Sequence, residues 1–235
     1  GSNEQQDDEL DESGAVYVFD YNGNVWNQTA YLKASNAGSG DALGVAVAIS
    51  GDGNTLVATA ADEDGMVTGV NGIQDQTVSV DAADSNIAAG AIYVFVHTNG
   101  SWSQQAYVKA SNTGVNDWFG SRVALSGDGN ILAAGAQLED SAAQGIDGTQ
   151  DDDTATAAGA VYLFARTEGA WSQIAYMKGS NTEAFDEFGS SLSLSRDGSL
   201  IAIGAQYEDS ASVGLGGNQT DNSGFDSGAV YLFSR

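Results

Sequence analysis

One passage is written repeatedly into this 235-residue chain, and the repetition constrains the fold more than any other feature. Copies start at Gly14, Gly90 and Gly159, and a fourth start, GAVYLFSR, begins at Gly228. The last two intervals between starts are equal in length, and the first interval is slightly longer. Each full copy contains a GA-x-Y-x-F motif, a tryptophan, an AY-x-K-x-SN motif and an Asp-Gly turn. Such repetition predicts an array of equivalent units, each packed on its neighbours.

Each unit contains four short segments rich in β-branched and aromatic residues, which is typical of strands. In one unit these segments are 120–126, 131–137, 160–166 and 171–178. Asp-Gly pairs separate the first two segments, and Asn-Gly or Glu-Gly pairs separate the last two. Glycine, and often Asn or Asp, accepts the positive φ of tight hairpins. We therefore expect an all-β chain in which each repeat is a four-stranded antiparallel meander.

Several of these segments are apolar at consecutive positions, for example 16–19 and 201–205, instead of alternating with polar residues. A sheet with one wet face should alternate, so both faces of these sheets should be covered. Four-stranded sheets stacked face to face around an axis form a β-propeller, which is the predicted fold. A linear β-solenoid is the alternative, but its coils are much shorter than the repeat of this chain.

The phase of the repeats predicts about three blades per chain. The chain starts with a third and a fourth strand, continues through two full blades and finishes with a first, second and third strand. Propellers usually need about four to eight blades, so we expect either a fragment of a larger ring or a homo-oligomer that closes it. A two-chain ring of about six blades is the simplest case.

The repeats occupy residues 13–235, and residues 1–12 are expected to be a disordered acidic tail that begins with Gly1-Ser2, which resembles an expression scar. The chain has 32 acidic and 7 basic residues, a formal charge of −25. Nucleic acid and anionic membranes are therefore excluded as expected partners, whereas cations or basic protein surfaces are favoured. Neither a membrane-spanning apolar run nor a cysteine is present.

Two pairs of residues carry a resemblance to a known family. Phe119-Gly120 and Phe188-Gly189 are each followed, after the next turn, by a Gly-Ala pair, and this pattern resembles the FG-GAP repeat. The first copy departs from it with Leu43-Gly44. The resemblance covers 13–235 and implies the β-propeller of integrin α subunits and of bacterial surface or secreted proteins. It implies an extracellular or cell-surface location and a role in adhesion.

The calcium loop of that family joins the first two strands, and here it is shortened. It reads Ser-Gly-Asp-Gly-Asn at 50–54 and 126–130, and Ser-Arg-Asp-Gly-Ser at 195–199. Calcium takes six to eight oxygen ligands, which one Asp and one Asn in a tight turn do not supply. We therefore expect no calcium site of the integrin type.

The long loops between the second and third strands offer other candidate cation ligands. They share a frame of glycines with clustered Asp, Asn and Gln, which suits a backbone folded around calcium. The predicted calcium ligands are Asn71, Asp75, Asp147, Asp151, Asp153, Asn218 and Asp221. The alternative is that these residue types simply populate ordered loops and solvated turns.

The same end of the blades carries the links to the next blade, where Trp118 and Phe185 are the predicted ligand-binding aromatics. Packing between blades is the alternative for both. The tryptophans at 26, 102 and 171 and the lysines at 33, 109 and 178 recur at fixed places, so we expect them to be structural.

Catalysis has little support, because His97 is the only histidine and cannot complete a His-based triad or zinc site with a second one. The expected function is a non-enzymatic extracellular module that binds a protein or glycan through its acidic loop face, with calcium as a cofactor. The alternatives are an accessory or catalytic domain of a secreted hydrolase, and a structural spacer in a large surface protein.

Overall fold

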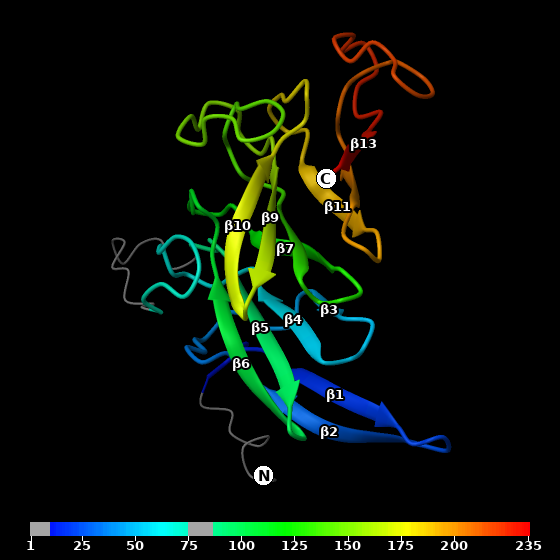
Figure 1. The fold of residues 1–235 in the computed structure, drawn as a ribbon. Coiled ribbons are helices and arrows are strands. Elements are labelled where there is room, and N and C mark those ends of the chain that lie inside the picture. The colour runs from blue at the N-terminus through cyan, green and yellow to red at the C-terminus, as the bar shows by residue number, and fades with distance from the viewer. Residues whose placement is uncertain (1–9, 75–86) are drawn as a thin grey trace.

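The structure, a computed structural model, describes residues 10–74 and 87–235. Within these residues all regular structure is β, in four antiparallel sheets that stack face to face in chain order (Figure 1). The predicted all-β fold of propeller blades is confirmed. None of the described residues forms a helix long and apolar enough to cross a membrane.

The two middle sheets are complete four-stranded meanders. The second sheet contains β3 (Val47–Ile49), β4 (Thr55–Ala60), β5 (Ala91–Thr98) and β6 (Ser101–Val108). The third sheet contains β7 (Phe119–Leu125), β8 (Ile131–Ala136), β9 (Ala160–Thr167) and β10 (Ala170–Met177). These bounds match the predicted segments of the unit closely.

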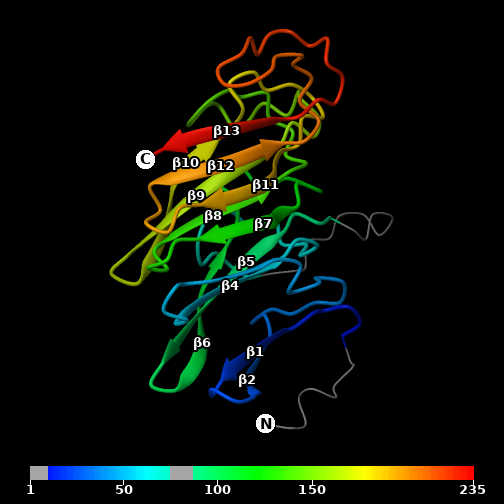
Figure 2. The same ribbon diagram turned by 90° about the vertical axis from the view of Figure 1, so that its right-hand side faces the viewer.

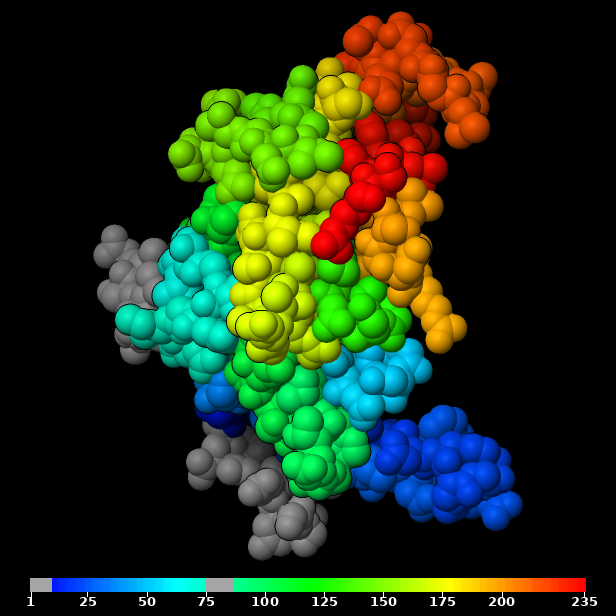
Figure 3. Space-filling view, viewed as in Figure 1, coloured from blue at the N-terminus to red at the C-terminus, as the bar shows by residue number. Residues whose placement is uncertain are grey.

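The two outer sheets are partial blades. The first contains β1 (Val16–Tyr21) and β2 (Trp26–Leu32), which correspond to a third and a fourth strand. The last contains β11 (Phe188–Leu194), β12 (Leu200–Ala205) and β13 (Ala229–Ser234), which correspond to a first, second and third strand. The β1–β2 hairpin lies at one end of the stack and β13 at the other (Figures 1 and 3). The predicted phase of the repeats is therefore confirmed.

The predicted tight turns form at the glycine-containing pairs between the third and fourth strands of each blade. At Asn99-Gly100 the φ angles are 52° and 79°, and at Glu168-Gly169 they are 52° and 84°. Positive φ at both central residues defines a type I′ turn, whose twist matches that of the flanking strands. These turns join β5 to β6 and β9 to β10 and set the register of each pair.

The core lies between the sheets, in three apolar clusters at the three junctions. β4 and β8 are buried at every position, so the expectation that both faces are covered holds for these strands of the middle sheets, whereas Val47 and Ile49 of the edge strand β3 are exposed. It fails for the outer sheets, because no sheet in the described part of the chain covers their outer faces. Trp171 of β10 is 5% exposed, whereas Trp26 of β2 is 68% exposed. The structural role expected for the repeated tryptophans thus depends on a neighbouring blade.

The glycine that starts each repeat lets two sheets approach closely. Gly159 has a φ of +78°, and a Cβ atom there would lie 2.2 Å from the carbonyl oxygen of Phe188 in the next sheet. Gly90 has the same relation to Phe119, with a corresponding separation of 2.1 Å. The recurring Gly-Ala and Phe-Gly motifs therefore meet at the junctions between blades.

Gly159→Ala should lower the free energy of unfolding by roughly 2–4 kcal/mol, because the added methyl group collides with backbone of the next blade. Gly145→Ala is the matched control, since Gly145 has a similar φ of +72° with no heavy atom within 4 Å of the added carbon. Its expected cost is about 1–2 kcal/mol, from the left-handed backbone alone. Equal losses in urea denaturation would contradict the close approach.

Candidate functional site

The strands place their connections at opposite ends of the stack. The tight turns lie at one end, and the long second-to-third loops lie at the other, together with the links between blades (Figure 2). The loop-bearing end contains every described residue that we predicted to bind a ligand or a cation. We call it the loop face.

A buried glutamate stands at the base of each long loop. Glu139 follows β8 and is 1% exposed, and its two carboxylate oxygens accept hydrogen bonds from the Tyr176 hydroxyl at 2.8 Å and the Lys178 ammonium at 2.7 Å. The same set recurs one blade earlier in Glu63, Tyr107 and Lys109. Both tyrosine–lysine pairs come from the end of a fourth strand. The repeated lysines at 109 and 178 are therefore structural, as predicted.

An asparagine from the preceding link completes this set. Asn112 donates to Glu139 Oε1 at 2.8 Å, and its own side-chain oxygen accepts from the Tyr162 hydroxyl at 2.6 Å. Burial and nearby carboxylates raise the pKa of Tyr162 well above its usual value, so its hydroxyl stays a donor. Three strands of a blade and the link before it are thus tied together beneath the loop face.

Two of the predicted calcium ligands accept hydrogen bonds that hold their loops to the fourth strand. Asp147 has a φ of 54°, and its Oδ1 accepts from the backbone N–H of Tyr176 at 2.9 Å. Asn71 does the same with Tyr107 at 3.0 Å. Side-chain acceptors in the left-handed conformation are a common way to fix such turns.

Two further predicted ligands accept hydrogen bonds from backbone N–H groups within their own turns of the last loop. The Oδ1 atom of Asn218 accepts from the N–H of Thr220 at 3.1 Å, and that of Asp221 accepts from the N–H of Ser223 at 3.2 Å. Asp75 lies outside the described residues. No three Asp, Glu, His or Cys side chains of the described chain gather as a metal-binding group. Calcium binding stays a prediction.

The last two predicted ligands, Asp151 and Asp153, line a hollow of about 560 Å³ on the loop face together with Asp117 and Asp140. Burial, assisted by neighbouring carboxylates, raises the pKa of Asp117 to about 7. The pKa of Asp153 is also raised, by desolvation and by repulsion from nearby acids. The hollow is therefore a place where additional positive charge is electrostatically favoured.

The two predicted aromatics belong to successive links, so they sit at different blade junctions. Trp118 is 38% exposed and Phe185 is 62% exposed, and their φ angles are 57° and 71°. Positive φ is unusual for bulky residues. In the next repeat the corresponding residue is Glu187, which also has a positive φ, so this backbone conformation is common to both links. Of these two positions, only that of Trp118 carries an aromatic side chain.

Sequence reasoning did not single out the buried glutamates at the start of the long loops. One signal was present. Glu63, Glu139 and Glu208 recur at one place, as do the Tyr and Lys of the fourth strand. A recurring Lys in a chain with only 7 basic residues indicates a buried partner of opposite charge.

The antiparallel meanders pack face to face, and their long loops lie at one end of the stack. This arrangement defines a partial β-propeller. The family model described as FG-GAP repeat matches residues 102–164 and 171–233. The chain therefore belongs to the FG-GAP repeat family. No curated protein matches it.

Among solved structures, the chain is similar to a hypothetical selenium-binding protein from Sulfolobus tokodaii. The identity is 10% and the TM-score is 0.46. The likeness covers 88% of this chain and 40% of that one, so the chain spans less than half the length of that protein.

Lys178→Met should lower the free energy of unfolding by roughly 3–5 kcal/mol, because it leaves the buried Glu139 carboxylate without its cation. The double variant Lys178→Met with Glu139→Gln removes both charges and should regain part of that loss. The measurement is urea denaturation of both variants at pH 7. A double variant less stable than Lys178→Met would contradict this account of the pair.

Proposed function

We propose that this chain is a non-enzymatic interaction module of an extracellular or bacterial cell-surface protein, and that its loop face binds a protein or glycan in adhesion. Membership of the FG-GAP repeat family carries this proposal. The way in which the repeats of this chain differ from one another also supports it. The strands, tight turns and glutamate bases repeat from blade to blade, whereas loop lengths and the exposed residues of the links differ.

The chemistry of the loop face indicates the kind of ligand. Its acidic hollow and the net charge of −25 attract a basic protein surface. Trp118 and Phe185 add exposed aromatic rings, which accept sugar faces or cationic side chains. A protein with exposed Lys or Arg, or a glycan, fits this combination.

Calcium dependence is part of the same proposal. The support is electrostatic, because Asp117, Asp140, Asp151 and Asp153 share one hollow and the pKa of Asp117 and of Asp153 is raised. A hard divalent cation relieves such repulsion through oxygen ligands. Since Asn71 and Asp147 are engaged in their loops, we place the proposed calcium effect on the hollow.

Binding is tested with labelled protein on a glycan array and on a panel of immobilised extracellular-matrix proteins. Trp118→Glu should weaken binding about tenfold or more, since it removes an exposed aromatic anchor. The backbone accepts this change, because Glu187 has the same conformation at the corresponding place. Glu168→Gln, at the opposite end of the stack, is the control and should bind as the original chain does. Binding unaffected by Trp118→Glu would contradict the proposed face.

Calcium is tested by thermal melting in millimolar calcium and in chelator. We expect calcium to raise the Tm by about 3 °C or more. The double variant Asp151→Asn and Asp153→Asn should abolish this increase, whereas Asp52→Asn at the turn end should retain it. Identical melts of the original chain in calcium and chelator would contradict calcium binding.

A further inference from the structure

Beneath the loop face, one buried carboxylate joins a lysine amine to an asparagine amide. Glu139 Oε2 lies 2.7 Å from the Lys178 Nζ atom, and Glu139 Oε1 lies 2.8 Å from the Asn112 Nδ2 atom. The same arrangement recurs one blade earlier, in Asn36, Glu63 and Lys109. Each set holds a nucleophilic amine, an amide carbonyl and a group that can carry protons between them.

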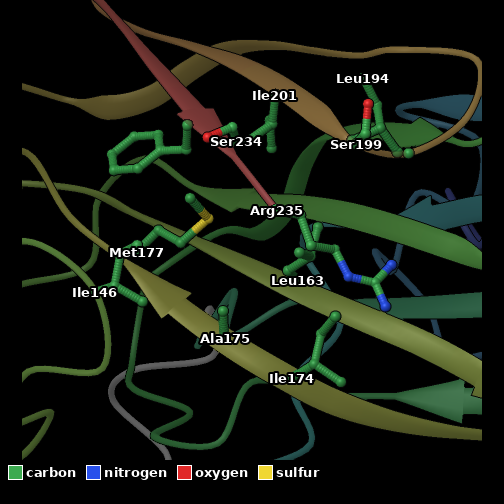
Figure 4. A pocket seen from close by; sticks show the side chains of 12 residues that line it. Ile146, Leu163, Ile174, Ala175, Met177, Leu194, Ser199, Ile201, Ser234 and Arg235 are labelled. Carbon is green, nitrogen blue, oxygen red and sulfur yellow. The ribbon is translucent and has the colours of Figure 1, made fainter.

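The end of β10 directs the lysine into this site. Tyr176 packs in the apolar cluster between the second and third sheets, whereas Met177 faces the other way, into an apolar hollow of about 300 Å³ beside the last sheet (Figure 4). Alternation along the strand returns Lys178 to the side of Tyr176. The side chain of Lys178 is 0% exposed and that of Glu139 is 1% exposed, so bulk water is kept from the pair.

Burial also changes the reactivity of the amine. Desolvation lowers the pKa of Lys178 and of Lys109 below the usual value for lysine, although the neighbouring glutamates oppose this change. A lysine desolvated in this way is a better nucleophile, because a larger fraction of its amine has a free electron pair. The hydrogen bond from Lys178 to Glu139 gives the departing proton an acceptor.

The amide of Asn112 is polarised at its carbonyl oxygen. Its Oδ1 atom accepts a hydrogen bond from the Tyr162 hydroxyl at 2.6 Å, and Tyr162 is fully buried. Burial and the nearby Glu139 raise the pKa of Tyr162 well above its usual value, so the hydroxyl keeps its proton. A fixed donor of this kind stabilises negative charge that develops on a carbonyl oxygen. In the earlier blade the Tyr93 hydroxyl donates to Asn36 Oδ1 at 2.8 Å.

We propose that Lys178 and Asn112 form an isopeptide bond, an amide bond between two side chains, with Glu139 as the proton carrier. The equivalent set of the earlier blade forms a second bond, between Lys109 and Asn36. Both bonds form spontaneously once the blades have folded and the three groups of each set have met. Their formation does not depend on the function proposed for the loop face.

The reaction balances in atoms and charge. Lys178 Nζ gives one proton to the Glu139 carboxylate and attacks the Cγ atom of Asn112. The negative charge that forms on Oδ1 lies beside the Tyr162 hydroxyl. The Cγ–Nδ2 bond then breaks, and Nδ2 leaves as ammonia with a second proton, which Glu139 transfers from Nζ. Glu139 ends as a neutral carboxylic acid, and no oxidant, reductant or co-reactant is consumed.

Two physical features favour this reaction. Attack requires Nζ and Cγ to approach to about 3–3.5 Å. Both nitrogens already bind the carboxylate of Glu139, and the flexible four-carbon stem of Lys178 supplies the remaining movement. The reaction also replaces a buried ion pair by neutral groups, which removes the cost of keeping two charges away from water.

Each bond closes one blade into a covalent loop. Asn112 lies in the link before β7 and Lys178 directly follows β10, so all four strands of the third sheet lie between them. Asn36 and Lys109 enclose β3 to β6 in the same way. A chain without cysteine thereby gains the constraint on its unfolded state that disulfides give to other proteins.

Intact-mass spectrometry of the denatured 235-residue chain tests the proposal. Each bond lowers the mass by about 17 Da, the mass of the ammonia released, so we expect a deficit of about 34 Da from the sequence mass. In a tryptic digest Lys109 and Lys178 should resist cleavage, and Asn112 should be found joined to Lys178. Loss of ammonia at an Asn-Gly pair such as Asn99-Gly100 gives the same mass change but leaves both lysines open to trypsin, and that outcome overturns the bonds.

Glu139→Gln keeps the size of the side chain and removes the proton carrier of one site. The deficit should fall from about 34 Da to about 17 Da, with the bond at Lys109 retained as an internal control for folding. Glu168→Gln, on the exposed β9–β10 turn, is the matched control and should keep the full deficit.

The unaltered chain decides the question should Glu139→Gln fail to fold. The full sequence mass in that chain overturns both bonds, and a deficit confined to one lysine supports the bond of that blade and overturns the other. An undiminished deficit in Glu139→Gln overturns the role of the carboxylate.

Discussion

The sheets of this chain carry apolar side chains on both faces, and a sheet buries both faces only between two neighbours. β4 and β8 are buried at every position because sheets lie on both sides of them. Where a neighbour is missing, equivalent side chains are exposed, as the contrast between Trp171 and Trp26 shows. Burial of apolar area dominates folding energetics, so each sheet of the stack stabilises the sheets beside it. The face-to-face stacking of the repeats follows from this constraint.

Within each blade, a buried polar set fixes how the parts meet beneath the loop face. Glu139 receives bonds from the preceding link, from the fourth strand and from its own loop, through Asn112, Lys178 and the N–H of Ser141. A buried charge of this kind is costly without its partners, so it penalises other arrangements of the strands. The loops above this base can differ in length and composition without disturbing the sheets, which suits a scaffold that presents variable binding surfaces.

Much of this fold was predictable from local patterns. The Asn99-Gly100 turn and the apolar segments beside it indicate a hairpin, and the phase of the repeats indicates incomplete outer blades. The candidate site was harder to predict. Asp147 has the composition of a cation ligand, yet its side chain holds the loop to Tyr176, a residue 29 positions away. Whether an oxygen faces a cation or a backbone N–H depends on that distant contact, which no local pattern contains.

By itself, the sequence determined the strands, their turns, the number of blades and the position of each blade boundary, because these depend on local residue types and on the repeat. Only the tertiary structure decided which members of a repeated set meet their partners. The glutamates at 63, 139 and 208 look alike in sequence, but the first two meet a Tyr and a Lys from a fourth strand, and the described last sheet has no such strand for the third. The reason is physical: burial and charge pairing belong to the space between blades, and a side chain acquires them from its neighbours.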